Sequence, residues 1–149
     1  MTNPSFGNEV KVTVNAGGAT LWTLALPYVA GPIKLRITAD RASKWKRGDT
    51  ECGPGGSFEG TPDMLLPTSP RGALIAKIGG SDSDCPQFTT EGAAPVAATS
   101  LKLVGVGSCC VIDVKASDSG PLFLTMNDSV AGFKTHYGAI EASITFAVT

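Results

Sequence analysis

The stretch Ile-Glu-Ala-Ser-Ile-Thr-Phe-Ala-Val, residues 140–148, decides the fold class. Apolar residues fall at every second position, and polar or small residues stand between them. This period of two predicts a β-strand with one buried face and one face in water, because successive side chains of a strand point to opposite sides. The same alternation recurs at residues 10–15 and 33–39. We therefore expect several strands whose inner faces pack together.

Five further segments are apolar at nearly every position, which suits strands in the middle of packed sheets. These segments are residues 21–26, 72–78, 101–106, 111–114 and 122–126. About eight short strands divided by turns predict an all-β fold, an antiparallel two-sheet β-sandwich. No linker or internal repeat divides the chain, so we expect one domain across residues 1–149.

The composition agrees with a folded β-protein and excludes several other classes. Hydrophobic residues make up 42% of the 149 positions and charged residues 17%, which is too apolar for a disordered chain. The 18 glycines and 10 prolines disfavour a helical bundle. No apolar run approaches the ~20 residues of a membrane-spanning helix. A net charge of −1 argues against wholesale electrostatic binding of nucleic acid.

Localisation is left open by the start of the chain. Residues 1–14 carry no visible secretory signal. We expect a chain that is cytoplasmic, exported by a non-classical route, or cut from a larger protein.

Residues 40–71 form the longest stretch without a clear strand signal. The stretch is rich in glycine, proline and polar groups, so we expect a functional loop that packs on its own side chains and contains no helix. The side chains expected to anchor this loop are Trp45, Phe58, Leu65 and Leu66.

A group of basic residues surrounds the tryptophan of this loop. The group consists of Arg41, Lys44, Lys46 and Arg47. A basic patch around an aromatic ring can bind an acidic polymer or a phosphate. Acidic residues in the same segment dilute the charge, so the alternative is a solvated loop with Trp45 as its anchor.

The cysteines and the single histidine, His136, offer little for metal or catalytic chemistry. The four cysteines, Cys52, Cys85, Cys109 and Cys110, form no Cys-x-x-Cys pair, which argues against structural zinc. Adjacent Cys109 and Cys110 point to opposite faces of a strand, so one of them can lie in the core, and a bridge from Cys85 to either is the alternative. No local motif supports a thiol nucleophile with His136 as its base, and we expect no enzymatic activity.

Two segments resemble a known family. The first contains Cys-Gly-Pro-Gly-Gly at 52–56 and Arg-Gly-Ala-Leu-Ile-Ala-Lys-Ile-Gly at 71–79, and the second contains Gly-Pro-Leu-Phe-Leu-Thr-Met-Asn-Asp at 120–128. In this order they resemble the PA-IL (LecA-type) family of bacterial lectins, over about residues 10–148. The resemblance implies a small β-sandwich of jelly-roll type, close to galactose-binding-like domains. It also implies binding of galactose-type sugars through one calcium ion, with sugar hydroxyls as direct calcium ligands.

The metal ligands implied by the resemblance are only partly present. Asp128 stands at the calcium carboxylate, and Gly132 and Trp45 stand where backbone carbonyls are supplied. Thr135 and His136 replace two asparagines, and a histidine nitrogen is a poor ligand for calcium. We expect calcium to bind weakly, at millimolar strength, or to be lost; the alternative is a ligand set rebuilt from Asp63, Asp128, Thr135 and carbonyl groups.

The sugar contacts implied by the resemblance are also altered. Thr61 and Met64, with Asp63 between them, stand where the family has the histidine and glutamine that touch the sugar. The predicted sugar-binding set is Trp45, Thr61, Asp63, Met64, Asp128, Thr135, His136 and Tyr137. Within it, Trp45, Tyr137 and His136 offer aromatic faces and polar groups. Alternatively, Asp128 only caps a turn, and His136 and Tyr137 only begin a strand.

The predicted function is therefore non-enzymatic carbohydrate binding, with glycans or galactose-type sugars as ligands. The alternative is a structural protein-interaction domain that kept the scaffold and lost the sugar. We also expect a homo-oligomer, because lectin sites bind weakly one by one and gain avidity together. An apolar edge strand at residues 140–148 is the predicted surface for pairing.

Overall fold

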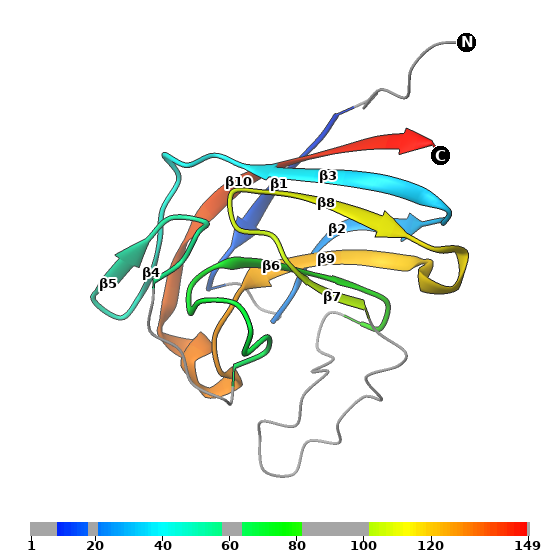
Figure 1. The fold of residues 1–149 in the computed structure, drawn as a ribbon. Coiled ribbons are helices and arrows are strands. Elements are labelled where there is room, and N and C mark those ends of the chain that lie inside the picture. Colours follow the sequence, from blue (N-terminus) through cyan, green and yellow to red (C-terminus); the bar gives the residue numbers. More distant parts are fainter. Residues whose placement is uncertain (1–8, 18–20, 58–63, 82–101, 149) are drawn as a thin grey trace.

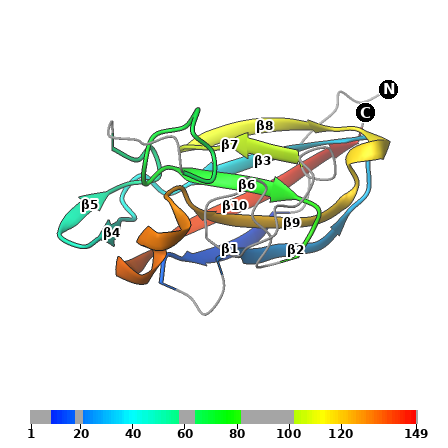
Figure 2. The ribbon, with the colours of Figure 1, turned by 90° about the horizontal axis from the view of Figure 1, so that it is seen from below.

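The computed structural model describes residues 9–17, 21–57, 64–81 and 102–148, and these form two antiparallel β-sheets packed face to face (Figures 1 and 2). The first sheet contains β5-β4-β10-β3-β8, with β1 also paired to β10, and the second has the order β2-β9-β6-β7. The strands are β1 Val10–Asn15, β2 Thr23–Val29, β3 Ile33–Ala39, β4 Trp45–Arg47, β5 Thr50–Cys52, β6 Leu74–Ile78, β7 Lys102–Gly105, β8 Cys109–Val114, β9 Gly120–Met126 and β10 His136–Val148. Two short 3-10 helices, η2 Ala116–Asp118 and η3 Val130–Thr135, flank β9. The predicted all-β, two-sheet antiparallel sandwich is confirmed.

The core follows from the alternation in the sequence. Ile140, Ala142 and Ile144 are buried between the sheets, whereas Glu141 between them is exposed. Burial of such side chains stabilises the fold by about 1.5–3 kcal/mol for each large aliphatic group.

A second apolar cluster covers the outer face of the four-stranded sheet. It consists of Trp22, Leu65, Ile75 and Phe123. β6 is therefore buried on both faces, which explains why its segment is apolar throughout. Lys77 on the same strand is also fully buried, and its ammonium group lies 4.7 Å from the ring centres of both Trp22 and Phe123.

β10 is an interior strand. β1 pairs along residues 139–144 on one side, and β3 and β4 pair along the other side. The prediction that residues 140–148 form an edge strand is therefore wrong, because β1 pairs along residues 139–144 and β3 pairs along residues 142–148 on the other side.

Residues 40–71 contain two strands that the sequence did not indicate. β4 and β5 form a hairpin with a two-residue turn, Gly48-Asp49, in which Gly48 has φ 58°. Glycine at the first central position with positive φ is the pattern of a type II′ turn. Residues 40–57 and 64–71 contain no helix. Of the expected anchors, Trp45 and Leu65 are buried and Leu66 is partly buried, while Phe58 lies outside the described residues.

The described cysteines Cys52, Cys109 and Cys110 are free thiols, and Cys85 lies outside the described residues. Cys109 is exposed, whereas Cys110 packs against the core, as expected for neighbours on a strand.

None of the helices in the described segments is long and apolar enough to cross a membrane.

Candidate functional site

The hairpin β4–β5 joins the start of β10 at one end of the sandwich and sets the register of the site (Figure 1). His136, Arg47 and Thr50 lie opposite one another on the three adjacent strands. Residues in one such row share a face of the sheet, so the side chains of His136 and Arg47 reach the same buried carboxylate, Asp128.

Asp128 follows β9 and is fully buried, with four N–H groups around its two oxygens. Its Oδ2 accepts from Arg47 Nε at 2.5 Å and lies 2.9 Å from His136 Nε2. Its Oδ1 accepts from the Ser129 backbone N–H at 2.7 Å and lies 3.3 Å from Arg71 Nε. A buried carboxylate needs such compensation, since an unpaired one is very costly to remove from water.

These neighbours determine the ionisation of Asp128. Burial alone raises its pKa, but the hydrogen bonds from His136, Ser129 and Arg47, together with the charge of Arg47, lower it more. The pKa of Asp128 therefore lies below its usual value, and this carboxylate is ionised at neutral pH.

His136 is a buried positioning residue in this arrangement. Its side chain has no exposed area, and its ring centre lies 4.5 Å from that of Phe133. Nδ1 has no hydrogen-bond partner among the described residues. We therefore assign the proton to Nε2, which donates to Asp128 and leaves Nδ1 unprotonated.

The turn through η3 closes over the carboxylate. A Cβ atom on Gly132 would lie 2.3 Å from Asp128 Oδ2, so only glycine fits there.

Gly48 at the hairpin tip is held by two residues near the start of β10. Its N–H donates to the carbonyl of Thr135, and its own carbonyl accepts from the Tyr137 hydroxyl.

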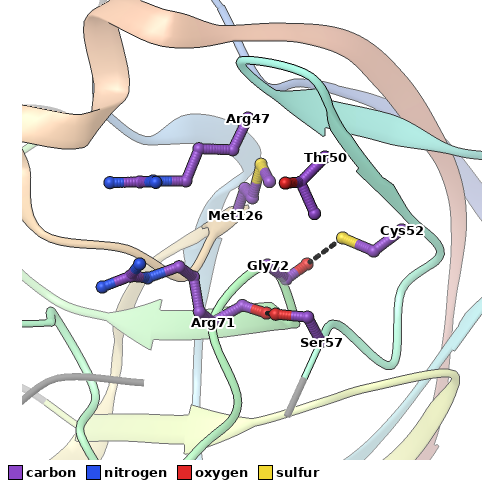
Figure 3. A pocket seen from close by; sticks show the side chains of 7 residues that line it. All are labelled: Arg47, Thr50, Cys52, Ser57, Arg71, Gly72 and Met126. Carbon is purple, nitrogen blue, oxygen red and sulfur yellow. Dashed lines mark hydrogen bonds between the residues drawn. The ribbon is translucent and has the colours of Figure 1, made fainter. Parts of the chain in front are cut away.

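A hollow opens beside this buried network (Figure 3). It has about 290 Å³ of atom-free space, including its open mouth, and is lined by Arg47, Thr50, Cys52, Ser57, Arg71, Gly72 and Met126. The side chains of Arg47 and Arg71 extend side by side in the same direction. The arginines are partly exposed, by 37% and 16% of their side chains, whereas Asp128 behind them is not.

Cys52 lies in this hollow with its Sγ 3.6 Å from the Gly72 carbonyl, to which it donates. Burial raises the pKa of the thiol, and Glu51 raises it further, against opposing effects of Trp45 and Lys44. The thiol therefore stays protonated at neutral pH, which makes it a weak nucleophile.

The structure separates the residues that the sequence predicted as one sugar site. Asp128 and His136 lie together, and both side chains are buried. Tyr137 is 49% exposed and lies on the opposite face of β10, where the Lys46 ammonium is 5.9 Å from its ring centre. Thr135 is exposed, and its hydroxyl donates to the Gly132 carbonyl at 2.7 Å.

Two further residues of the predicted sugar-binding set have buried side chains. Trp45 is 1% exposed, and its Nε1 donates to the Gly72 carbonyl at 2.8 Å, so neither ring face is available to a sugar. Met64 is also 1% exposed and pairs through its backbone with Ser129. Thr61 and Asp63 lie outside the described residues.

The donors around Asp128 do not fit a calcium ion. Calcium requires six to eight oxygen ligands, but both carboxylate oxygens here face N–H groups. The guanidinium groups of Arg47 and Arg71 also bring positive charge to this point. The Gly132 carbonyl, predicted as a ligand, accepts the Thr135 hydroxyl. Nowhere among the described residues do three or more His, Cys, Asp or Glu side chains cluster as a metal site.

The predicted site set contains none of the seven residues that line the hollow, and so it missed the polar side chains of Arg47, Arg71, Thr50 and Ser57. The sequence did carry a signal for Arg47, which belongs to the basic group around Trp45. It carried none for the pairing with Asp128, because 81 positions separate these residues along the chain.

Comparison with solved structures identifies a similar fold. A structure described as "EclA N-terminal domain; PllA-like lectin" matches with a TM-score of 0.57 and 17% sequence identity, over 97% of this chain and 98% of that chain. No family model matches the sequence. No curated protein matches it. The likeness confirms a lectin-like β-sandwich, while membership of the PA-IL family stays a prediction.

Proposed function

We propose that this chain is a lectin-type carbohydrate-binding domain that holds a sugar in the hollow between Arg47, Arg71, Thr50 and Ser57. The observation that carries the proposal is this hollow, located at the end of a sandwich similar to one described as a lectin.

The groups around the hollow match the chemistry of a sugar. Sugar hydroxyls both donate and accept hydrogen bonds, and the hydroxyls of Thr50 and Ser57 can do the same. Guanidinium groups donate in a fixed fork geometry, and Met126 supplies an apolar surface for C–H groups. The buried Asp128 holds both arginines, so little conformational entropy is lost when a ligand binds.

We infer that the sugar is held by direct hydrogen bonds and not through calcium. The reason is the donor set around Asp128, in which N–H groups take the place of oxygen ligands. We also infer no catalysis, since His136 is buried against Asp128 and the Cys52 thiol stays protonated. Cys109 and Cys110 lie on β8, and β3 separates this strand from β10, which begins at His136. Neither thiol therefore lies on a strand next to that of the histidine.

Binding of the whole chain to a panel of neutral and acidic mono- and oligosaccharides tests this proposal, with calcium and with a chelator. We expect saturable binding to at least one saccharide in the chelator. Thr50→Val should weaken binding by roughly tenfold, since it leaves a sugar hydroxyl unpaired. Thr13→Val, at an exposed position on β1, should leave binding unchanged. Absence of saccharide binding in both buffers would refute the proposal.

A second candidate function, assembly through the sandwich, is favoured by two apolar side chains on the edge strand β2. Leu24 and Tyr28 are 51% and 64% exposed on this strand. Exposed edge strands with apolar side chains are surfaces for pairing with another chain. Light scattering that shows an oligomer, lost in Leu24→Lys, together with no saccharide binding would favour this second function.

A further inference from the structure

We propose that the chain has a second saccharide site, where a neutral hexopyranose ring stacks on Tyr137 and bonds to the side-chain amide of Asn15. The site goes beyond the proposed function, because it lies apart from the hollow of Arg47 and Arg71 (the Arg47–Arg71 hollow). It is a second hollow, the Tyr137 hollow, with about 430 Å³ of atom-free space including its open mouth. The end of β1 and the start of β10 line it with Asn15, Gly17, His136, Tyr137 and Gly138.

The two hollows lie on opposite faces of the sheet and share no lining residue. Tyr137 and His136 are neighbours on β10, so their side chains point to opposite faces. The His136 side chain shares its face with Arg47 and has no exposed area, so His136 contributes only backbone atoms to the Tyr137 hollow. The side chain of Tyr137, in contrast, is 49% exposed. Each hollow can therefore hold a ligand of its own.

The ring of Tyr137 is held in place for stacking. Its hydroxyl donates to the Gly48 carbonyl in the turn of the β4–β5 hairpin. The Lys46 ammonium group lies 5.9 Å from the ring centre, but β4 and β1 pair with opposite sides of β10, and Lys46 does not line the hollow. The ring therefore stays open toward β1. An aromatic ring fixed in this way loses little conformational entropy when a ligand packs against it.

Two glycines keep part of the wall free of side chains. A Cβ atom on Gly17 would lie 2.4 Å from the carbonyl oxygen of His136, which is too close for any side chain. Gly138 has φ 94°, a backbone conformation that other residues rarely adopt. Neither position accepts a larger residue without strain, so the space beside Tyr137 remains open.

The groups of the Tyr137 hollow match a neutral sugar. No charged side chain lines it, since its exposed side chains are those of Asn15 and Tyr137. The Asn15 side chain makes no hydrogen bond within the described part of the chain, so its two N–H donors and its oxygen remain for sugar hydroxyls. The negative face of the tyrosine ring attracts the weakly positive C–H groups on one side of a pyranose ring. None of these contacts needs a metal ion.

NMR titration of the labelled whole chain with methyl β-galactopyranoside and methyl β-glucopyranoside, in a chelator, tests this site. We expect at least one glycoside to give saturable shifts at the amides of Asn15, Gly17 and Gly138 and at the ring protons of Tyr137. Galactitol has the hydroxyl groups of a sugar but no ring, so it should give much smaller shifts. An equal affinity for galactitol would overturn the stacking.

Matched variants separate the ring of Tyr137 from its hydroxyl. Tyr137→Ala should weaken binding at this site roughly tenfold, whereas Tyr137→Phe keeps the ring and should stay within about threefold of the wild type. Asn15→Ala should weaken binding by roughly fivefold, because sugar hydroxyls lose their partner. Thr50→Val, in the other hollow, should leave these shifts unchanged. Equal losses in Tyr137→Ala and Tyr137→Phe would overturn the role of the ring.

The outcomes separate this site from the proposed function. Shifts at Thr50 and Ser57 without any at Tyr137 would overturn the second site and keep the proposed function. Shifts at the Tyr137 hollow alone would support the second site and contradict sugar binding in the Arg47–Arg71 hollow. Shifts at neither hollow would overturn the second site, and the saccharide panel would then decide the proposed function. Because the wild-type titration needs no variant, it decides the question even if Tyr137→Ala unfolds.

Discussion

At the residue scale, the carboxylate of Asp128 connects two guanidinium groups and an imidazole from three different segments of the chain. We expect Asp128→Asn to lower the free energy of unfolding by about 3 kcal/mol at pH 7, since it breaks a buried charge network. Urea unfolding measures this loss. Asp113→Asn, at an exposed position on β8, should change it by less than about 0.5 kcal/mol.

The pH dependence of this loss follows from the lowered pKa of Asp128. The unfolded chain binds the proton more readily than the folded one, so the network contributes its full stability above the ordinary carboxyl value. That contribution disappears as pH falls through the lower pKa of the folded state. The difference between wild type and Asp128→Asn should therefore shrink below about pH 4. A difference that stays constant from pH 7 to pH 2 would contradict the ionised, paired carboxylate.

Asn127, next to this carboxylate, fixes the loop that precedes Arg71. Its Nδ2 donates to the carbonyls of Leu66, Ser69 and Pro70, and its Oδ1 accepts from the Leu66 N–H. The side chain is fully buried, so Asn127→Ala leaves several polar groups unsatisfied. We expect a loss of about 2–3 kcal/mol in thermal or urea unfolding. The exposed Asn15→Ala provides the control, and an equal effect of both changes would contradict this role.

At the scale of elements, the hairpin β4–β5 carries Arg47 to the site. Gly48→Ala places a side chain at φ 58°, which should destabilise the turn by about 1 kcal/mol. Because Gly48 also contacts Thr135 and Tyr137, the change should weaken ligand binding as well. Gly55→Ala has open space around its Cβ and should affect neither property. Unchanged unfolding and binding in Gly48→Ala would show that the hairpin does not position Arg47.

The sequence predicts the long strands because burial imposes a period of two on them. β1 and β3 have the predicted bounds, and β10 contains the predicted residues 140–148 but begins earlier, at His136. The hairpin was missed because its strands are three residues long and rich in charge, which is too short for a periodic signal. Pairing of strands is set by tertiary contacts, so the alternation of residues 140–148 could not distinguish an interior strand from an edge.

The candidate site could be predicted only in part for the same reason. Asp128 and His136 entered through a family resemblance and do lie together. The ion pairs of Asp128 with Arg47 and Arg71 join distant positions of the chain and leave no local pattern in the sequence. Burial of Trp45 also depends on neighbours from other strands, so the sequence could not exclude it as a sugar platform.

At the scale of the whole molecule, we expect a stability that does not depend on calcium. A ligand that binds only the folded state raises the melting temperature by mass action. Since the donors around Asp128 do not fit calcium, millimolar calcium and a chelator should give the same melting temperature within about 1 °C. A rise of several degrees in calcium that disappears in Asp128→Ala would contradict this expectation and favour a calcium site.

Binding of a saccharide at the Arg47–Arg71 hollow without calcium can be measured directly on the molecule. The most direct test is NMR titration of the labelled chain, in a chelator, with the saccharide of the panel that binds most tightly, following backbone amides and arginine Nε–H signals. We expect the largest shifts at Arg47, Arg71, Thr50 and Ser57. Shifts confined to the Tyr137 face with Asn15 and Gly17, or shifts that require calcium, would contradict it.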